Sequence, residues 1–281
     1  MPDEVLYEED GSLAYVTLNR PEKLNTLNGA LLESFSQAID RAAASEAVRA
    51  VILRGAGRAF SGGYDLNPGG QLVAPPVNRP NRRWDPVRDF QNMGRNVKRF
   101  MKLWEIPKPV IAQVHGWCVG GGTDLALCSD LIFMAEDAYI GYPPARVYGT
   151  PTSMIWVYRL GLEAAKRYML TGDAIDAPTA LRIGLVSQIA PAEELPGIVE
   201  RFARRFENIP ANQLALNKLL INQAYENMGL RTTQMFGTFF DGMTRNTQEA
   251  IDWRDSFSTL GFRETIRRRD GPFEDYGERP R

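Results

Sequence analysis

The stretch PVIAQVHGWCVGGGTDLALCSDLIFMAE, residues 109–136, decides the fold. PVIAQVHG (109–116) and LIFMAE (131–136) are apolar runs of the length of a strand. Between them, three glycines open the segment 120–128, which has the composition of a short helix. A strand, a helix and a second strand in this order are typical of an α/β fold.

The same alternation extends toward the N-terminus. LAYVTLN (13–19) and VRAVILRG (48–55) are predicted strands, and apolar residues recur at helical spacing between them. A further helix is predicted over 90–104. These repeated strand–helix–strand units predict an α/β core.

Other parts of the chain depart from this alternation. The stretch between Leu66 and Pro86 is rich in proline and contains three arginines, so we expect a long loop of the kind that often forms a lid or binds a ligand. The ending, RRRDGPFEDYGERPR (267–281), is polar and is expected to be loosely ordered unless a neighbour holds it. After about residue 205 strand patterns stop, and three helices with apolar faces are predicted, over 210–226, 231–247 and 246–268.

The composition excludes several classes of protein. The 281 residues have a net charge of −1, without the global basic field that drives nucleic-acid binding. No run approaches the roughly 18 apolar residues of a membrane span. Two cysteines, Cys118 and Cys128, cannot build a disulfide framework, and the acidic start MPDEVLYEED does not resemble a secretory signal. We therefore expect a globular cytoplasmic protein that binds neither nucleic acid nor membrane.

The first segment with chemical potential is GRAFSGGYDL (57–66), which follows a predicted strand. Ser61, Gly62 and Gly63 allow a sharp turn that exposes backbone N–H groups. The segment does not match a dinucleotide fingerprint, because Phe60 stands where the third glycine should be. A turn with no function at all is the plain alternative.

The second segment is the triple glycine 120–122, directly before a predicted helix with Asp124 in its first turn. The start of a helix offers unpaired N–H donors and a field that favours negative charge. The plain alternative is that the glycines only allow close packing and that Asp124 only favours the helix dipole.

The sequence resembles the crotonase (enoyl-CoA hydratase/isomerase) superfamily over roughly residues 5 to 260. The motifs that carry this resemblance occur in the order and at the spacing of the family: LNRPEKLNTLN (18–28), FSGGYDL (60–66), PKPVIAQVHGWCVGGGTDLALCSDL (107–131) and TGDAIDAPTALRIGLVSQIAPAEEL (171–195). The resemblance implies a core of ββα turns in a spiral over 1–204. It also implies a C-terminal helical region, 205–281, used to form a homotrimer or a dimer of trimers.

The resemblance further implies an acyl-CoA thioester substrate, with coenzyme A as part of the substrate and no other cofactor. The backbone N–H groups of Tyr64 and Gly121 would bind the thioester oxygen, and Asp124 would transfer a proton. The other residues that the resemblance places along the substrate are Lys23, Leu24, Ser61, Gly62, Gly63, Asp65, Leu66, Gly120 and Pro144. Lys98, Arg99 and Lys102 on the predicted helix, with Arg79, Arg82 and Arg83 on the loop, could assist in binding the phosphates.

The sequence departs from the family pattern at the second carboxylate. The family's hydratases use two glutamates; Asp124 stands at the first position, and Pro144, or Ala145 with a shift of one residue, stands at the second. Neither Pro144 nor Ala145 can transfer a proton. Replacements that we consider are Tyr142, Arg146, Tyr148, Thr152 and Asp241, although arginine more often pairs with a carboxylate and tyrosine more often packs.

No metal site is predicted, because Cys118 and Cys128 have no second ligand pair and His115 is the only histidine. A structural role is expected for His115. Hydration of a 2-enoyl-CoA is the favoured function. The alternatives are double-bond isomerisation, thioester hydrolysis, carbon–carbon cleavage on the same scaffold, and non-catalytic binding of acyl-CoA.

Overall fold

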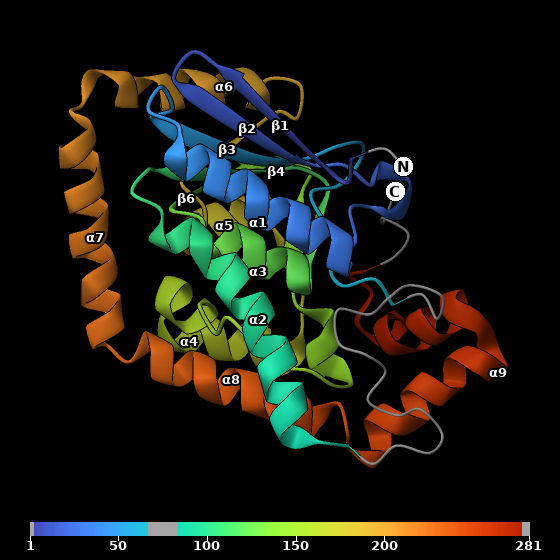
Figure 1. Cartoon of the computed structure of the whole chain (residues 1–281). Helices are drawn as coiled ribbons and strands as arrows, with labels where there is room; N and C mark the ends of the chain where they lie inside the picture. The colour runs from blue at the N-terminus through green and yellow to red at the C-terminus, as the bar shows by residue number, and fades with distance from the viewer. Residues whose placement is uncertain (1–2, 67–83, 277–281) are drawn as a thin grey trace.

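The computed structural model describes residues 3–66 and 84–276 and has an α/β core with C-terminal helices (Figure 1). A six-stranded sheet has the order β1-β2-β3-β4-β6-β9, and a smaller sheet has the order β5-β7-β8. The strands are β1 (Val5–Asp10), β2 (Leu13–Leu18), β3 (Ala50–Gly55), β4 (Val110–Val114), β5 (Trp117–Val119), β6 (Leu131–Ala135), β7 (Tyr139–Gly141), β8 (Ile175–Asp176) and β9 (Gln188–Ala190). Every neighbouring pair of the large sheet from β2 to β9 is parallel, as the α/β prediction requires.

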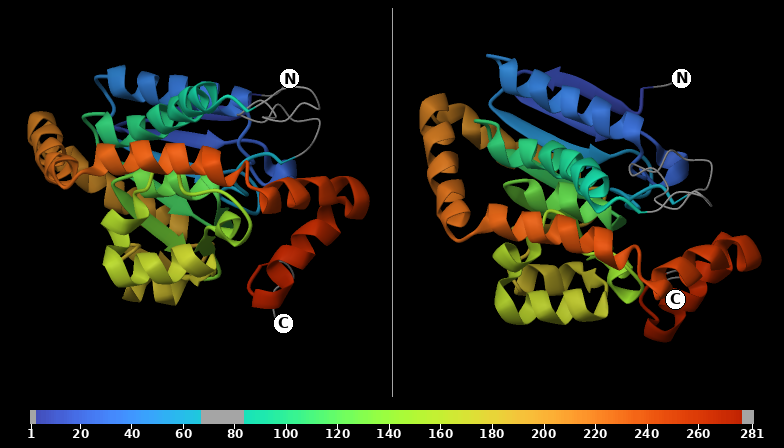
Figure 2. Two further views of the ribbon diagram at one scale, coloured as in Figure 1. Left: turned by 90° about the horizontal axis from the view of Figure 1, so that it is seen from below. Right: turned by 60° about the horizontal axis from the view of Figure 1, so that its bottom comes forward.

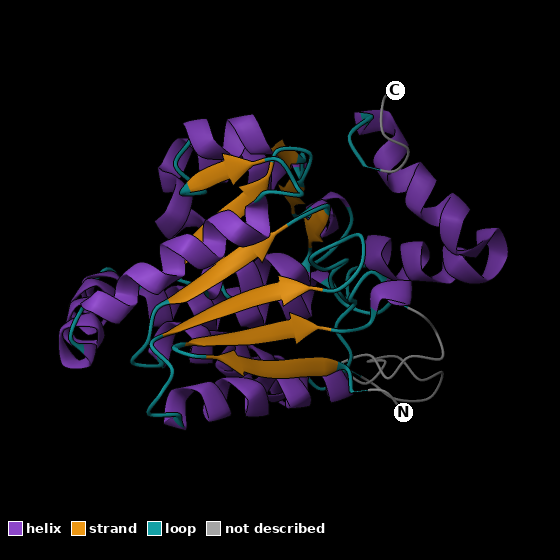
Figure 3. Ribbon diagram, turned by 90° about the horizontal axis from the view of Figure 1, so that it is seen from above, coloured by secondary structure: helices purple, strands orange, loops and turns teal. Residues whose placement is uncertain are grey.

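Helices lie on both sides of the large sheet (Figure 3). α1 packs against β1 and β2, whereas α6 packs against β3 and β4. The helices are α1 (Gly29–Ala44), α2 (Pro86–Glu105), α3 (Gly121–Cys128), α4 (Trp156–Thr171), α5 (Ala177–Arg182), α6 (Leu195–Ala203), α7 (Ala211–Asn227), α8 (Leu230–Thr244) and α9 (Gln248–Asp270), with 3-10 turns η1 (Pro21–Lys23), η2 (Pro143–Arg146), η3 (Arg204–Asn208) and η4 (Gly271–Phe273). No helix in the described part of the chain is long and apolar enough to cross a membrane.

α1 illustrates how the sequence determines the elements of the core. Asn28 caps the helix by accepting the N–H of Leu31 at 2.7 Å. Leu31, Phe35 and Ile39 then recur every four residues and are fully buried against the sheet. The strands and helices predicted between residues 13 and 136 are confirmed to within a few residues, and α2 begins earlier than predicted because Asp85 caps it and Pro86 starts it. The predicted loop with Arg79, Arg82 and Arg83 lies mostly at 67–83, outside the described residues.

Some elements of the core were not predicted. β1 is an edge strand whose burial is confined mainly to Val5, so it lacks the apolar run of a buried strand. α4 contains Gly161 with φ 70°, which interrupts its helical geometry and its sequence pattern. α5 and α6 are short and begin next to prolines that resemble loop signals.

The three predicted C-terminal helices are confirmed as α7, α8 and α9. Figure 2 shows α7 on one side of the molecule and α9 on the other, with α8 between them. α7 is tied to the core by Lys218, whose ammonium lies 2.8 Å from Asp130 and donates to Leu103 O and Lys108 O. The apolar face predicted for this helix is mostly not buried within the chain, since Leu220 is 72% exposed.

The polar ending is held in place up to residue 276. Arg146 donates to Asp275 at 2.6 Å and to Asp270 at 3.2 Å, and its guanidinium lies over the ring of Phe273 at 3.7 Å. The ending was expected to be loosely ordered unless a neighbour held it, and the buried side chain of Arg146 is such a neighbour, because it pairs with Asp270 and Asp275.

Candidate active site

Backbone hydrogen bonds bring the two glycine turns together. Ser61 donates its N–H to Trp117 O at 3.0 Å, and Val119 donates its N–H to Ser61 O at 3.0 Å. This pairing joins the loop after β3 to β5. Gly63 and Gly121 consequently lie side by side, since a Cβ atom on Gly63 would come within 3.3 Å of Gly121 N.

No side chain fits where the turns meet. Gly63 has φ +84°, a left-handed conformation that L-residues rarely adopt, and a Cβ atom there would lie 2.8 Å from Val119 O. A Cβ atom on Gly122 would lie 2.7 Å from the side chain of Ser61. The close approach of two backbones therefore requires glycine in both turns.

Two amide groups at this junction have no recorded acceptor in the part of the chain that the structure describes. Leu27 donates its N–H to Gly63 O at 2.8 Å and accepts the N–H of Asp65 at 3.1 Å, so Tyr64 takes no part in that pairing through its own N–H. Gly121 is the first residue of α3, where N–H groups have no acceptor within the helix. Two adjacent, unpaired donors of this kind can bind an oxygen atom that carries negative charge.

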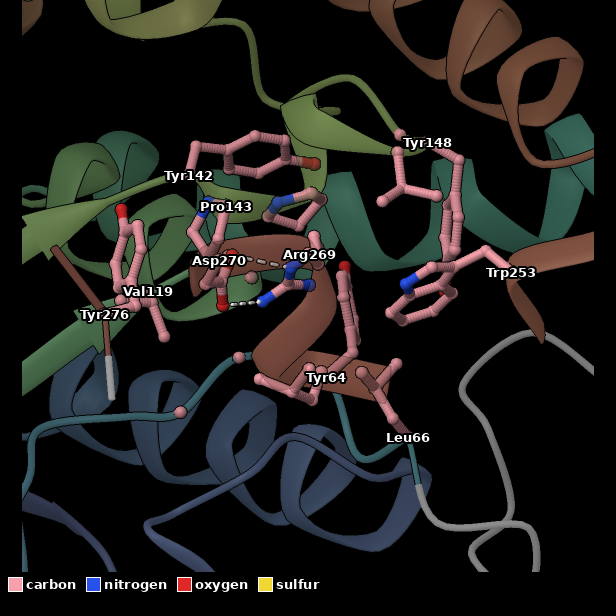
Figure 4. Close-up of a pocket in the computed structure, with 18 of the residues that line it drawn as sticks. Tyr64, Leu66, Val119, Tyr142, Pro143, Tyr148, Trp253, Arg269, Asp270 and Tyr276 are labelled. Carbon is pink, nitrogen blue, oxygen red and sulfur yellow. Dashed lines mark hydrogen bonds and ion pairs between the residues drawn. The ribbon is translucent and has the colours of Figure 1, made fainter. Parts of the chain in front are cut away.

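The turns open onto a cavity of about 390 Å³. Figure 4 shows Tyr64 between Tyr276 on one side and Tyr148 and Trp253 on the other, so that the wall is rich in aromatic rings. The residues predicted from the sequence as catalytic or substrate-binding that line the cavity are Leu24, Gly62, Gly63, Tyr64, Leu66, Gly120, Gly121 and Pro144.

Other predicted residues lie behind or beside the cavity wall. Ser61 is fully buried, donates its hydroxyl to Asn25 O at 2.9 Å and accepts the N–H of Gly63 at 3.2 Å. Asp65 forms an ion pair with Arg20 at 3.1 Å. These two residues support the first turn.

The predicted cations are less closely associated with the cavity. Lys23 is exposed in η1, next to Leu24. On α2, Arg99 and Lys102 form ion pairs with carboxylates of α1, at 2.6 and 2.5 Å, and do not line the cavity. Lys98 is exposed on the same helix and does not line the cavity either, so the assistance of these cations in binding the phosphates stays a prediction.

Asp124 lies in the first turn of α3, is 1% exposed, and is buried behind the residues that line the cavity rather than among them. Its carboxylate accepts the N–H of Ser153 at 3.3 Å and also the Ser153 hydroxyl. Burial raises the pKa of Asp124 to about 7; the two hydrogen bonds from Ser153 oppose this rise, and the negative charge of Asp241 adds to it. A carboxyl group with this pKa is present in both protonation states near neutral pH.

Comparison with known proteins identifies the family. A family model described as enoyl-CoA hydratase/isomerase matches residues 8–251 of the chain. The chain belongs to the enoyl-CoA hydratase/isomerase family of enzymes. The resemblance that the glycine-turn motifs indicated is therefore confirmed.

Individual relatives are similar over most of their length. A crystal structure of an enoyl-CoA hydratase from Mycobacterium smegmatis is 38% identical, with a TM-score of 0.91 over 98% of this chain and 95% of that one. An enoyl-CoA hydratase/isomerase from Xanthobacter autotrophicus Py2 is 29% identical, with a TM-score of 0.84 over 96% and 98% of the two chains. A crotonyl-CoA hydratase from Syntrophomonas wolfei is 32% identical over 82% of this chain and 84% of its own. The α/β fold with two sheets and C-terminal helices is thus the fold of solved enoyl-CoA hydratases.

This member of the enoyl-CoA hydratase/isomerase family has Pro144 in the cavity wall where the resemblance placed a second carboxylate. Of the five replacements considered, Arg146 does not line the cavity and forms ion pairs with Asp270 and Asp275. The other four do line it. They are Tyr142, Tyr148, Thr152 and Asp241.

Asp241 is the carboxylate among these four. It lies on α8, is 5% exposed, and accepts a hydrogen bond from Arg245 Nε at 2.8 Å. Burial raises its pKa, and the charge of Arg245 opposes that rise. The two tyrosines also have raised pKa values because they are buried, so their hydroxyl groups stay protonated at neutral pH.

The C-terminal helices contribute wall residues that the sequence did not single out. They are Arg245, Trp253, Arg254, Phe262, Ile266, Arg269, Asp270 and Tyr276. No local pattern marks these residues, since their place in the cavity depends on the path of α8 and α9 across the core.

His115 and the cysteines do not line the cavity. The ring of His115 forms a hydrogen bond with Gly57 O at 2.9 Å, and both cysteines are buried. Within 3–66 and 84–276, no group of three or more histidine, cysteine, aspartate or glutamate side chains could hold a metal ion.

The raised pKa of Asp124 makes stability depend on pH. Unfolded, this carboxyl group ionises near its ordinary pKa of 3.8, whereas in the folded protein it ionises near 7. As the pH rises from about 4 to 7, the free energy of unfolding of the wild type therefore falls relative to that of Asp124→Asn, which cannot ionise. The expected fall is up to ~4 kcal/mol. Urea unfolding of both proteins between pH 4 and 8 measures this difference.

Asp252→Asn is the control, because it removes the same charge from an exposed position on α9. Its stability should follow that of the wild type across the pH range. If Asp124→Asn also followed the wild type, the raised pKa would be contradicted.

Proposed function

We propose that this enzyme hydrates 2-enoyl-CoA thioesters through an enolate whose oxygen is held by the N–H groups of Tyr64 and Gly121. The observation that supports this most strongly is the pair of adjacent amides without a recorded acceptor at the edge of a cavity, with the buried carboxylate of Asp124 in the first turn of the helix that begins at Gly121.

The amides suit the charge that develops in this reaction. When water adds to the β-carbon of an enoyl thioester, negative charge moves onto the carbonyl oxygen. Donors that are already oriented toward this charge stabilise it without reorganisation, and the loss of one such donor typically costs about 10²–10³ in rate. The helix dipole of α3 adds a favourable field at Gly121.

Asp124 suits the transfer of a proton to or from the α-carbon. General acid–base catalysis is most effective when the pKa of the group is near the working pH. The pKa of Asp124, about 7, meets this condition.

The substrate contacts follow the cavity wall. We assign the thioester to the glycine turns, with Gly62, Gly63 and Gly120 beside it, and the acyl group to the region of Leu66 and Pro144. Leu24 would contact the pantetheine arm. Ser61 and Asp65 would act by supporting the first turn, and the exposed Lys23 would reach the phosphates of coenzyme A.

A second candidate reaction is double-bond isomerisation. Pro144 favours it, because isomerisation does not require a second carboxylate at that position. One carboxylate that moves a proton between two carbons of the substrate would suffice.

Incubation with crotonyl-CoA and longer 2-enoyl and 3-enoyl thioesters tests the proposal. We expect loss of the enoyl absorbance and a mass gain of one water, and we expect Asp124→Asn to lower turnover by about 10²–10⁴ with CoA binding retained. Tyr64→Phe should keep turnover within a few-fold, since only its backbone N–H is used.

Other outcomes separate the alternatives. A new conjugated product of unchanged mass would establish an isomerase. If no thioester reacted although CoA ligands bound, or if Asp124→Asn were fully active, the proposed function would be contradicted.

We further propose that the helical region from residue 205 onward assembles the chain into a trimer or a dimer of trimers. α7 and α8 expose a large apolar surface, which is unusual for a monomer. Its residues are Leu216, Leu219, Leu220, Ile221, Met235, Phe236, Phe239, Phe240 and Met243.

The cytoplasm remains the expected compartment, because both cysteines are free and buried; cell fractionation would test it.

Light scattering tests the assembly. The wild type should have three or six times the mass of one chain, and Phe236→Asp should lower it. Leu170→Asp, on exposed α4, is the matched control and should leave the mass unchanged. A monomeric wild type would contradict the proposal.

A further inference from the structure

Asp241, on α8, has its carboxylate close to Pro144. Pro144 stands at the position where the resemblance placed the family's second carboxylate. A Cβ atom on Gly149 would lie 3.3 Å from Asp241 Oδ1 and 3.5 Å from Pro144 Cβ. The carboxylate and the proline therefore flank the same point of the cavity wall. Tyr142 Oη lies 3.7 Å from that point.

The loop after η2 is shaped to admit this carboxylate. Gly149 has φ +99°, a conformation that L-residues rarely adopt, and because it lacks a side chain the backbone of the loop can approach Asp241 closely. Hydrogen bonds hold the loop on α8: Gly149 donates its N–H to Thr244 Oγ1 at 2.9 Å, and Thr150 donates its hydroxyl to Gly237 O at 2.8 Å. Asp241 is thus fixed relative to the wall that carries Pro144.

The two buried carboxylates have different partners. Asp241 is paired with Arg245, which also binds both carboxylate oxygens of Asp89, at 2.9 and 3.0 Å. Within 3–66 and 84–276, the donors to Asp124 are the neutral N–H and hydroxyl groups of Ser153. Burial raises the pKa of both carboxyl groups, but Asp241 has a guanidinium partner that favours its charged form and opposes this rise, so of the two Asp241 is the better suited to accept a proton.

We infer that Asp241 is the second proton-transfer group of this site and takes the role that Pro144 cannot perform. This inference rests on the proposed hydration. The Asp241 carboxylate removes a proton from water as the water oxygen bonds to the β-carbon. The π electrons of the Cα–Cβ bond form the enolate, and Asp124 gives its proton to the α-carbon. Return of the proton from Asp241 to Asp124 through water restores the starting state, and the net reaction adds one water.

A purely structural role for Asp241 is the alternative, because its ion pair with Arg245 joins α8 to Asp89 on α2. Asp89 provides the matched control, since it pairs with the same arginine but does not line the cavity. If only the ion pairs matter, the loss of either carboxylate would have the same effect.

The experiment compares Asp241→Asn with Asp89→Asn in two reactions. The first is hydration of crotonyl-CoA. The second is exchange of the α-hydrogens of butyryl-CoA with D₂O, in which one carboxylate removes and returns a proton and Asp124 suffices. We expect Asp241→Asn to lose about 10²–10⁴ in hydration and to keep exchange. Asp89→Asn should keep both within a few-fold, and Asp241→Glu should retain part of the hydration.

Three results would overturn the inference. They are full hydration by Asp241→Asn, an equal loss of hydration by Asp89→Asn, and a loss of exchange by Asp241→Asn as large as its loss of hydration. Failure of the proposed function can be told apart from failure of this inference. A wild-type enzyme that hydrated no enoyl thioester would contradict both the proposed hydration and the role of Asp241. An active wild type with a fully active Asp241→Asn would contradict only the role of Asp241.

Discussion

The close approach of two backbones, at Gly63 and Gly121, is the constraint on which the rest of the site depends. The turns can meet only because neither carries a side chain, and the pairing of Ser61 with Trp117 and Val119 holds them together. Their meeting leaves the N–H groups of Tyr64 and Gly121 without a recorded acceptor in the described chain. The α/β core positions this junction, because one turn follows β3 and the other leads from β5 into α3.

The remaining chemistry depends on buried carboxylates with different surroundings. Asp124 has hydroxyl and amide donors from Ser153, and burial dominates its pKa. Asp241 has Arg245 as its partner. Asp241 lies on α8, a C-terminal helix that does not belong to either sheet. Although Pro144 stands where the resemblance placed a second carboxylate, two buried carboxylates, Asp124 and Asp241, thus act electrostatically on Tyr64, one of the two residues whose N–H groups we propose as oxyanion donors. The same α8 also exposes an apolar face, so in the proposed trimer the assembly and the site would share one helix.

Local signals predicted much of the fold and of the site. The α/β core, the glycine turns and the position of Asp124 at the start of a helix were predicted because each depends on a short run of residues such as 120–128, whereas the catalytic roles came from the family resemblance and stay predictions. Ser153 was not identified as the partner of Asp124, since the contact joins positions 29 residues apart. Asp241 was one of five residues considered as a replacement for the second carboxylate. It lines the cavity because of the course of α8, whereas Arg146 faces the C-terminal segment. β1 and α4 were not predicted, because an exposed edge strand and a helix interrupted by Gly161 lack the usual periodicity.

The most direct measurement of the central claim is a crystal structure of the protein with butyryl-CoA, which cannot be hydrated. We expect the thioester oxygen to lie about 2.7–3.1 Å from both Tyr64 N and Gly121 N, as donors that stabilise an oxyanion require. A well-ordered thioester whose oxygen contacts neither amide would contradict the claim.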